Sequence, residues 1–202
     1  MIHKFPWKFH PNEDLEVVTG ANGMVDKQAT VLVDLLAHKD PHLRVLEIGA
    51  GTGGATLPIL SALGGMDSGT PPRFLSYDVT DITTGFFEKL QEKTAIWGEL
   101  ISYKKLDIEQ DIEHQGFETE HYDLVVAANV LHATTNMSRT MANVRTLLKP
   151  GGTLILIELI PTMAGLTNIF GIFDGCKAFS FSFSELLLHL ASLICFTDEK
   201  RN

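Results

Sequence analysis

Four glycines that begin two residues after a glutamate are the first feature of the chain that could do chemistry. Gly49, Gly51, Gly53 and Gly54 follow Glu47 in the stretch LRVLEIGAGTGGATLPIL. Glycines let the backbone turn sharply with no side chain in the way, so a ligand can lie against main-chain N–H groups. The spacing differs from the G-x-G-x-x-G that seats a dinucleotide pyrophosphate, and the neighbouring acid disfavours a phosphate. A ligand with a positively charged, amino-bearing end, such as S-adenosylmethionine, suits this bend; the alternative is a strand–helix turn whose glycines serve geometry alone.

Acidic side chains follow the next two apolar runs of the chain. Asp81 precedes the turn after the second run and can accept hydrogen bonds from two ribose hydroxyls, with Asp78 as the alternate. A helix-capping role is the competing interpretation of Asp81. After the third run, Asp107 can accept from an adenine amino group, while Ile108 can present its main-chain N–H to the ring. For Asp107 the competing interpretation is a solvated acid beside an acidic loop.

A histidine follows the fourth apolar run, where a substrate would face the ligand. His132 lies in the segment NVLHATT, shortly after Asn129. Imidazole can remove a proton near neutral pH, and it needs a partner to fix its tautomer. Glu158, near the end of the following run, could hold one ring nitrogen and stabilise the imidazolium. A histidine–carboxylate pair can also be purely structural, and the residues alone leave both interpretations open.

Alternating strands and helices must position these residues. Apolar residues with helical spacing predict helices at 24–38, after the glycines, at 87–97, and after Asn136, which can cap the last one. Apolar runs predict buried strands at 45–48, 74–79, 101–106, 122–128 and 153–159, and the acidic stretch 109–120 predicts a mobile or helical surface connection. This alternation is typical of an α/β fold with a doubly wound, mostly parallel, Rossmann-like sheet, whose ligands bind at the carboxyl ends of the strands.

Bulk properties exclude several functional classes. The 202 residues fit one domain, and a formal charge of -9 with no basic cluster argues against nucleic-acid or membrane partners. Cys176 and Cys195 indicate neither a disulfide framework nor a zinc site, so no metal is expected. The N-terminus lacks an apolar core of signal-peptide length, and the apolar tract 186–196 is too short to span a bilayer. We therefore expect a cytoplasmic protein; its oligomeric state is left open.

Four segments together resemble one known family. VLEIGAGTGGATLPIL, YDVTDITTGFFEKL, NVLHATT and LLKPGGTLILIEL are similar to the C-methyltransferase domain of fungal highly reducing polyketide synthases, a class I, type 12-like methyltransferase. The resemblance covers roughly residues 35–159. It implies S-adenosylmethionine as methyl donor and a β-ketoacyl chain on an acyl carrier protein as acceptor, in secondary metabolism.

The resemblance also implies roles for individual residues. It makes His132 the catalytic base and Glu158 the residue that orients it. It makes the glycine bend and the acids after the second and third strands cofactor contacts, which here are Glu47, Gly49, Gly51, Gly53, Asp81 and Asp107. Ile108 and Asn129 complete the predicted cofactor site. The resulting reaction is C-methylation of the carbon between ketone and thioester.

The chain departs from this family at both ends. We expect residues 1–23 to be irregular and to lack the large N-terminal helical lid, the methyltransferase domain to span 24–160, and 161–202 to be an atypical tail that could be truncated. Ser182 and Glu185 could open a helix over 186–194, so we expect the last strands of the sheet to be missing. Two alternatives follow: a free-standing small-molecule O- or N-methyltransferase, and an inactive cofactor-binding remnant that serves as a scaffold.

Overall fold

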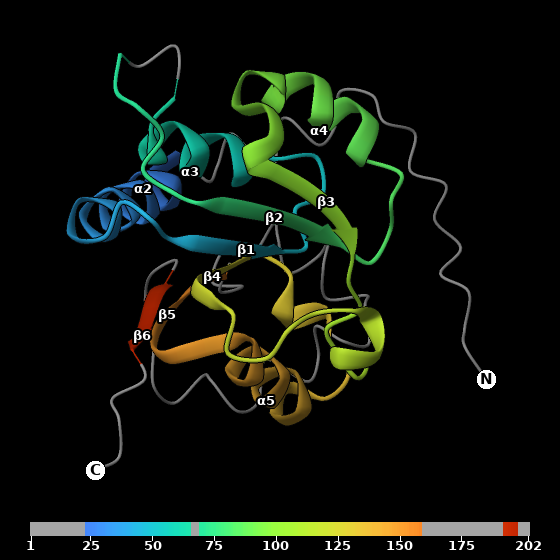
Figure 1. The fold of residues 1–202 in the computed structure, drawn as a ribbon. Helices are drawn as coiled ribbons and strands as arrows, with labels where there is room; N and C mark the ends of the chain where they lie inside the picture. The colour runs from blue at the N-terminus through green and yellow to red at the C-terminus, as the bar shows by residue number, and fades with distance from the viewer. Residues whose placement is uncertain (1–22, 66–68, 159–191, 198–202) are drawn as a thin grey trace.

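A single twisted sheet forms the centre of the protein (Figure 1). The computed structural model describes residues 23–65, 69–158 and 192–197. The strand order is β3-β2-β1-β4-β5-β6, and every neighbouring pair is parallel except β5 and β6. The strands are β1 (Arg44–Ile48), β2 (Ser76–Asp81), β3 (Ile101–Lys105), β4 (Tyr122–Ala128), β5 (Leu148–Glu158) and β6 (Ser192–Thr197). The doubly wound α/β prediction is confirmed.

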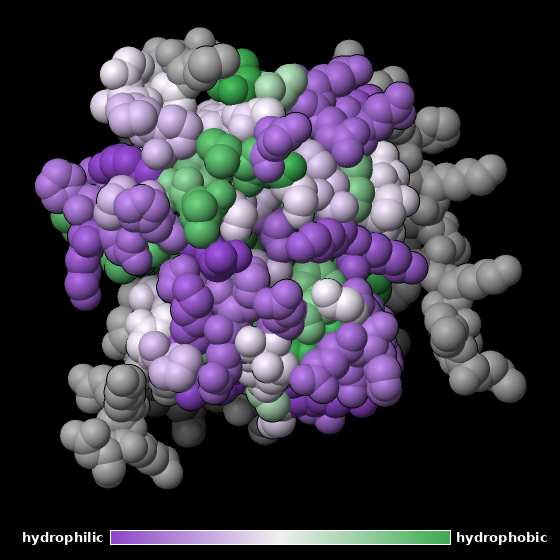
Figure 2. All heavy atoms as spheres, viewed as in Figure 1, coloured by the Kyte–Doolittle hydropathy of each residue, from purple (hydrophilic) through white to green (hydrophobic). Residues whose placement is uncertain are grey.

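Helices cover both faces of the sheet because each strand contributes apolar side chains alternately to two cores. In β1, Val45 lies in one core while Leu46 and Ile48 lie in the other. Figure 1 shows α2, α3 and α4 over one face and α5 over the other. The helices are α2 (Gly23–Lys39), α3 (Thr56–Leu63), α4 (Phe87–Thr94), α5 (Met137–Leu147), and the short 3-10 turns η1 (Ala95–Leu100), η2 (Glu113–Gln115) and η3 (Leu131–Ala133). Hydrophilic residues cover most of the face in Figure 2, with small apolar patches between them.

Local signals located most of these elements. Asn136 caps α5 as predicted, since its side chain accepts a hydrogen bond from the Arg139 N–H at 3.0 Å. The helix predicted at 87–97 is interrupted: α4 ends at Thr94, and Trp97 lies in η1, where its indole donates to the Gly64 carbonyl at 2.8 Å. The acidic stretch 109–120 contains the 3-10 turn η2. Its Ile112 and Phe117 are buried in the core that also contains Leu46 and Ile48.

The C-terminal part of the sheet differs from the expectation. β6 pairs antiparallel with β5 along its whole length, from Thr153 opposite Thr197 to Glu158 opposite Ser192. The sheet therefore has a strand beyond β5, and the helix predicted at 186–194 is wrong at residues 192–194. The backbone groups on the outer edge of β5 need partners, which β6 supplies. Of the segment 1–23 that was predicted to be irregular, Gly23 belongs to α2 instead, and residues 1–22 lie outside the described residues. Ser182, Glu185 and most of the tail also lie outside them.

Backbone hydrogen bonds continue past the strand ends and hold the connecting loops together at the carboxyl edge of the sheet. They join the loop after β1 to β2, the loop after β3 to β2, and the loop after β4 to β5. The three bonds run from Ala50 N to Thr80 O (2.9 Å), from Leu106 N to Asp81 O (2.9 Å), and from Asn129 N to Ile157 O (2.7 Å). Within the described residues, no helix is long and apolar enough to cross a membrane.

Candidate active site at the carboxyl edge of the sheet

The glycine bend after β1 has one crowded position and one open position. Gly49 has φ +69°, and a Cβ there would lie 2.3 Å from Val130 Cγ2. Gly51 has φ +53°, but a Cβ there would meet no atom within 4 Å. At Gly53, a Cβ would lie 2.4 Å from Leu90 Cδ1. Gly49 and Gly53 are therefore required for close packing, as expected if these glycines serve the geometry of the turn alone. The open space beside Gly51 is where a ligand can approach the main chain.

Asp81 joins the glycine bend to the end of β2. Its Oδ2 accepts from the Gly51 N–H at 2.9 Å, and its Oδ1 accepts from the Thr83 N–H at 2.9 Å. Asp81 does not cap the following helix, because Phe86 is the N-cap residue of α4. Oδ1 also accepts from Thr83 Oγ1 at 3.3 Å, so Oδ2 is the oxygen that keeps capacity for a second hydrogen bond. The side chain thus stands beside the open position with an acceptor available to a hydroxyl-bearing ligand.

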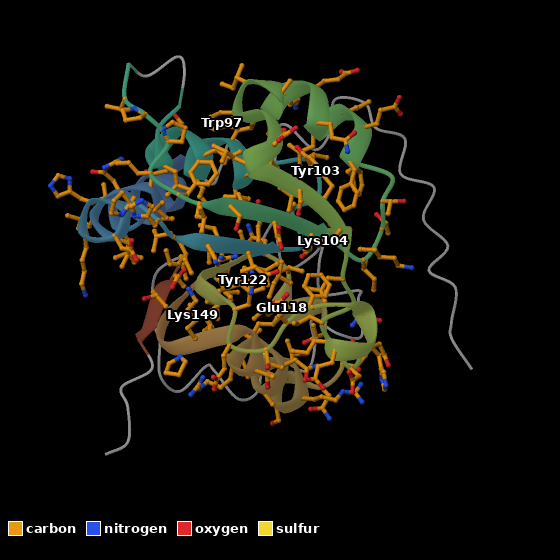
Figure 3. All side chains as sticks on the ribbon, in the orientation of Figure 1. Trp97, Tyr103, Lys104, Glu118, Tyr122 and Lys149 are labelled. Carbon is orange, nitrogen blue, oxygen red and sulfur yellow. The ribbon has the colours of Figure 1, made fainter. Side chains whose placement is uncertain are left out.

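Asp78 lies three residues earlier and on the opposite face of β2. Its Oδ1 accepts from Ser102 Oγ at 2.5 Å, and its Oδ2 accepts from Lys104 Nζ at 2.6 Å and from Tyr122 OH at 2.6 Å. Burial raises the pKa of Asp78, but these hydrogen bonds outweigh it and hold the pKa below its usual value. Figure 3 shows Tyr103 and Lys104 on opposite sides of β3. Asp78 therefore links strands β2, β3 and β4 away from the glycine bend.

Glu47 lies in the core under the glycine bend and not on its open side. The residue is 1% exposed, and its Oε2 accepts from Tyr77 OH at 2.9 Å. Burial raises the pKa of Glu47 to about 7, the hydrogen bond from Tyr77 opposes that shift, and the charge of Asp81 adds to it. Glu47 can therefore act on a ligand through its charge across the bend, and this charge changes near neutral pH.

This raised pKa predicts a pH-dependent cost of folding. The pKa of Glu47 is about 7 in the folded protein, against an ordinary value of 4.5, so the folded state holds the proton more tightly. Stability is then lost as pH rises from about 4.5 to about 7, by on the order of 3 kcal/mol. We expect Glu47→Gln, which keeps an acceptor for Tyr77, to raise the free energy of unfolding at pH 8 and much less at pH 5.

Urea denaturation at the two pH values measures this difference. Glu92→Gln, at an exposed position of α4, is the matched control and is expected to change stability little at either pH. An equal gain for Glu47→Gln at pH 5 and pH 8 would contradict the assignment.

Two amide side chains hold the loop after β3. The Gln115 amide bonds both backbone groups of Asp107, accepting from its N–H at 2.8 Å and donating to its carbonyl at 2.9 Å. Asn143 of α5 donates to the Ile108 carbonyl at 2.7 Å. Asp107 is half-buried, and its Oδ1 accepts from the Glu109 N–H at 3.0 Å. The loop beside the candidate site is thus held by hydrogen bonds. Asp107 within it is half-buried, unlike the solvated acid of the competing interpretation.

The segment after β4 carries the predicted base, and it begins beside the end of β5, where the Asn129 N–H donates to the Ile157 carbonyl. Asn129 has φ +53°, a left-handed conformation that asparagine tolerates. His132 lies in η3, and Glu158 is the last residue of β5, whose Ile157 pairs with Ala128 of β4. The side chains of His132 and Glu158 lie outside the described part of the structure, so their pairing stays a prediction.

The structure brings Gly51, Asp81, Asp107 and the segment carrying Asn129 and His132 to one edge of the sheet, and it separates Asp78 from them. Sequence reasoning missed Gln115, Asn143 and Glu109. Glu109 accepts three hydrogen bonds at Oε1, from the Thr135 N–H (2.8 Å), Thr135 Oγ1 (2.5 Å) and the Asn136 N–H (3.0 Å). No spacing rule marks these contacts, because their partners lie 8, 26 and 35 positions away along the chain.

Known proteins that are similar to this chain indicate its family independently of the site geometry. Residues 46–154 match the family model described as "Methyltransferase domain". A highly reducing polyketide synthase of Aspergillus niger is 50% identical over 150 residues, which is 74% of this chain and 6% of that protein. The chain therefore spans only about 6% of the length of the curated relatives that it matches.

Solved structures share the fold. The trans-methyltransferase CalH, in a complex with SAH, is 35% identical with a TM-score of 0.66, covering 81% of this chain and 47% of that one. The CMeT domain of the citrinin polyketide synthase is 26% identical with a TM-score of 0.68, covering 83% of this chain and 45% of that one. The glycine bend and the acid at the end of β2 thus lie on a sheet of the class I methyltransferase type.

Proposed function

Since the chain belongs to the methyltransferase domain family, we propose that it methylates the α-carbon of a β-ketoacyl intermediate carried on an acyl carrier protein. It is an S-adenosylmethionine-dependent methyltransferase domain, similar to those of fungal highly reducing polyketide synthases. One structural observation carries the cofactor site: a bend with open space at Gly51, joined at 2.9 Å to the carboxylate that ends the next strand. The likeness to the citrinin synthase CMeT domain supports carbon as the acceptor atom.

The residues present fit the cofactor. Gly51 leaves room for a ligand against the main chain, and Asp81 has acceptor capacity for ribose hydroxyls. Asp107 and Ile108, in the loop held by Gln115, would take the adenine end. Glu47 beneath the bend and Asn129 beyond β4 would stand near the amino-bearing end. A buried carboxylate under the bend disfavours phosphate and favours a cationic ligand.

The chemistry divides between cofactor and chain. S-adenosylmethionine supplies an electrophilic methyl group. The carbon between ketone and thioester is acidic, so His132 would take its proton and leave an enolate on the substrate. Glu158 would hold the imidazole and stabilise the imidazolium, which must later lose this proton to solvent. The main contribution of the fold is to hold base and substrate in a productive geometry.

Calorimetry and mass spectrometry together test the proposal. We expect the chain to bind S-adenosylmethionine and to add one methyl group to a β-ketoacyl thioester mimic, located at the α-carbon by fragmentation. Cofactor binding without transfer would support the inactive cofactor-binding remnant instead, and absence of cofactor binding would refute the proposal. A methyl group found on oxygen or nitrogen would support the small-molecule methyltransferase.

The two acids of β2 give a matched pair for the cofactor site. We expect Asp81→Asn to weaken S-adenosylmethionine binding by roughly ten- to hundredfold, because hydrogen bonds to a charged acceptor contribute about 1.5–3 kcal/mol. Asp78→Asn should lower the thermal unfolding temperature with little effect on cofactor affinity, because Asp78 links strands on the other face of the sheet. Calorimetry on both variants decides, and a reversed pattern would assign the ribose to Asp78.

A further inference from the structure

Glu109 connects two loops that come from different strands. It lies two residues after Asp107, in the loop after β3, and its Oε1 reaches the backbone N–H groups of Thr135 and Asn136. Thr135 Oγ1 donates to the same oxygen at 2.5 Å. Three donors on one carboxylate oxygen make this the densest polar contact between the two loops among the described residues.

The loop after β3 is itself firmly held. Gln115 fixes the backbone of Asp107 from both sides, and Asn143 of α5 bonds the carbonyls of Ile108 at 2.7 Å and Gln110 at 3.0 Å. The Glu109 N–H also donates to Asp107 Oδ1 at 3.0 Å, so Glu109 is held in a fixed position relative to Asp107 and Ile108.

The other loop contains the predicted base between two anchors. At one end, Val130 packs against Gly49, where even a methyl group would not fit. In the middle, Thr134 closes η3 by donating its N–H and Oγ1 to the Leu131 carbonyl at 3.1 and 2.7 Å. At the other end, Thr135 is bound to Glu109. His132 lies in η3, between the anchor on the glycine bend and the anchor on Glu109.

We propose that Glu109 is a positioning residue that couples the adenine side of the cofactor site to the loop carrying His132. The inference rests on the proposed function. A cofactor bound against Asp107 and Ile108 would fix its own position relative to the loop after β3, and Glu109 holds Thr135 and the start of α5 to that same loop. Cofactor binding then further restrains the segment that carries the base, although Glu109 does not contact the reacting atoms.

The surroundings of the Glu109 carboxylate favour its ionised form. Burial raises the pKa of Glu109, but hydrogen bonds from Thr135 and Asn136 and the nearby charge of Arg139 outweigh it, so the pKa is lowered. The carboxylate also stands before the first turn of α5, where negative charge is favourable. Glu109 therefore stays ionised at neutral pH, and charge-assisted hydrogen bonds of this kind are stronger than neutral ones.

Hydrogen–deuterium exchange with S-adenosylhomocysteine tests the coupling without requiring turnover. In the wild-type chain, the ligand should slow exchange in peptides covering both 105–109 and 130–136. In Glu109→Ala, protection should persist in 105–109 and be lost in 130–136, while the transfer rate falls roughly ten- to hundredfold at a nearly unchanged cofactor KM. Glu109→Gln keeps an acceptor oxygen and should lie between the two.

Glu113→Ala is the matched control, since it removes an exposed carboxylate from the same acidic stretch. It should retain protection in both peptides. If Glu109→Ala retains ligand-induced protection in 130–136, or if KM rises while the maximal rate is unchanged, the coupling is refuted. If the wild-type chain fails to bind S-adenosylhomocysteine, the proposed function and the coupling fall together; if it binds and transfers while Glu109→Ala behaves like wild type, only the coupling falls.

Discussion

Replacement of His132 with alanine is expected to abolish methyl transfer and to leave the affinity for S-adenosylmethionine nearly unchanged. A positioned general base contributes about 10²- to 10⁴-fold to the rate, and the α-proton of the substrate has no other acceptor in the proposed reaction. The proposed cofactor contacts come from the glycine bend and from Asp81, which are joined at 2.9 Å and which the substitution does not touch. Mass spectrometry of the thioester mimic measures transfer, and calorimetry measures affinity.

Glu158→Gln sharpens this test. It removes the charge that would stabilise the imidazolium, so transfer should fall less than in His132→Ala. The pH at which transfer sets in should move lower, because the imidazolium loses its proton more readily without the neighbouring carboxylate. Equal losses of transfer and cofactor affinity in His132→Ala would refute the assigned role, because they would indicate a collapsed site.

Gly49→Ala is expected to destabilise the protein strongly and to disturb the cofactor site with it. The added Cβ would lie 2.3 Å from Val130 Cγ2, at a φ of +69° that side chains rarely adopt. Left-handed strain costs about 1–2 kcal/mol and overpacking about 1–3 kcal/mol, so the free energy of unfolding should fall by roughly 2–5 kcal/mol. Urea denaturation measures the loss.

Gly51→Ala is the matched comparison in the same bend. Its Cβ meets nothing within 4 Å, so only the strain of φ +53° remains, about 1–2 kcal/mol. The methyl group would occupy the open space, and cofactor affinity should fall more than stability does. Adding Val130→Ala to Gly49→Ala removes the 2.3 Å contact but leaves Val130 Cβ at 2.8 Å, so it should restore stability only in part. A stable Gly49→Ala chain that binds the cofactor normally would contradict this account.

Elements whose signal is local were predictable. The strand 122–128 was located to the residue, because its continuous apolar run 124–128 is typical of a parallel strand that is covered on both faces. Asn136 was predicted as a cap because capping involves only the next turn of backbone. Elements that depend on a partner were harder. β6 was predicted as a missing strand, yet it is defined by its antiparallel pairing with β5.

The sequence by itself determined the doubly wound fold, the bend at Gly49 to Gly53 and the set of polar residues at the strand ends, because periodicity and glycine spacing act over a few residues. The tertiary structure decided the function of individual acids. Asp78 and Asp81 differ by three positions and therefore point to opposite faces, one into a strand-linking network and one toward the glycine bend. Only packing buries Glu47 under the bend, and only the approach of two distant loops gives Glu109 its three donors, since such contacts join residues that no local pattern relates.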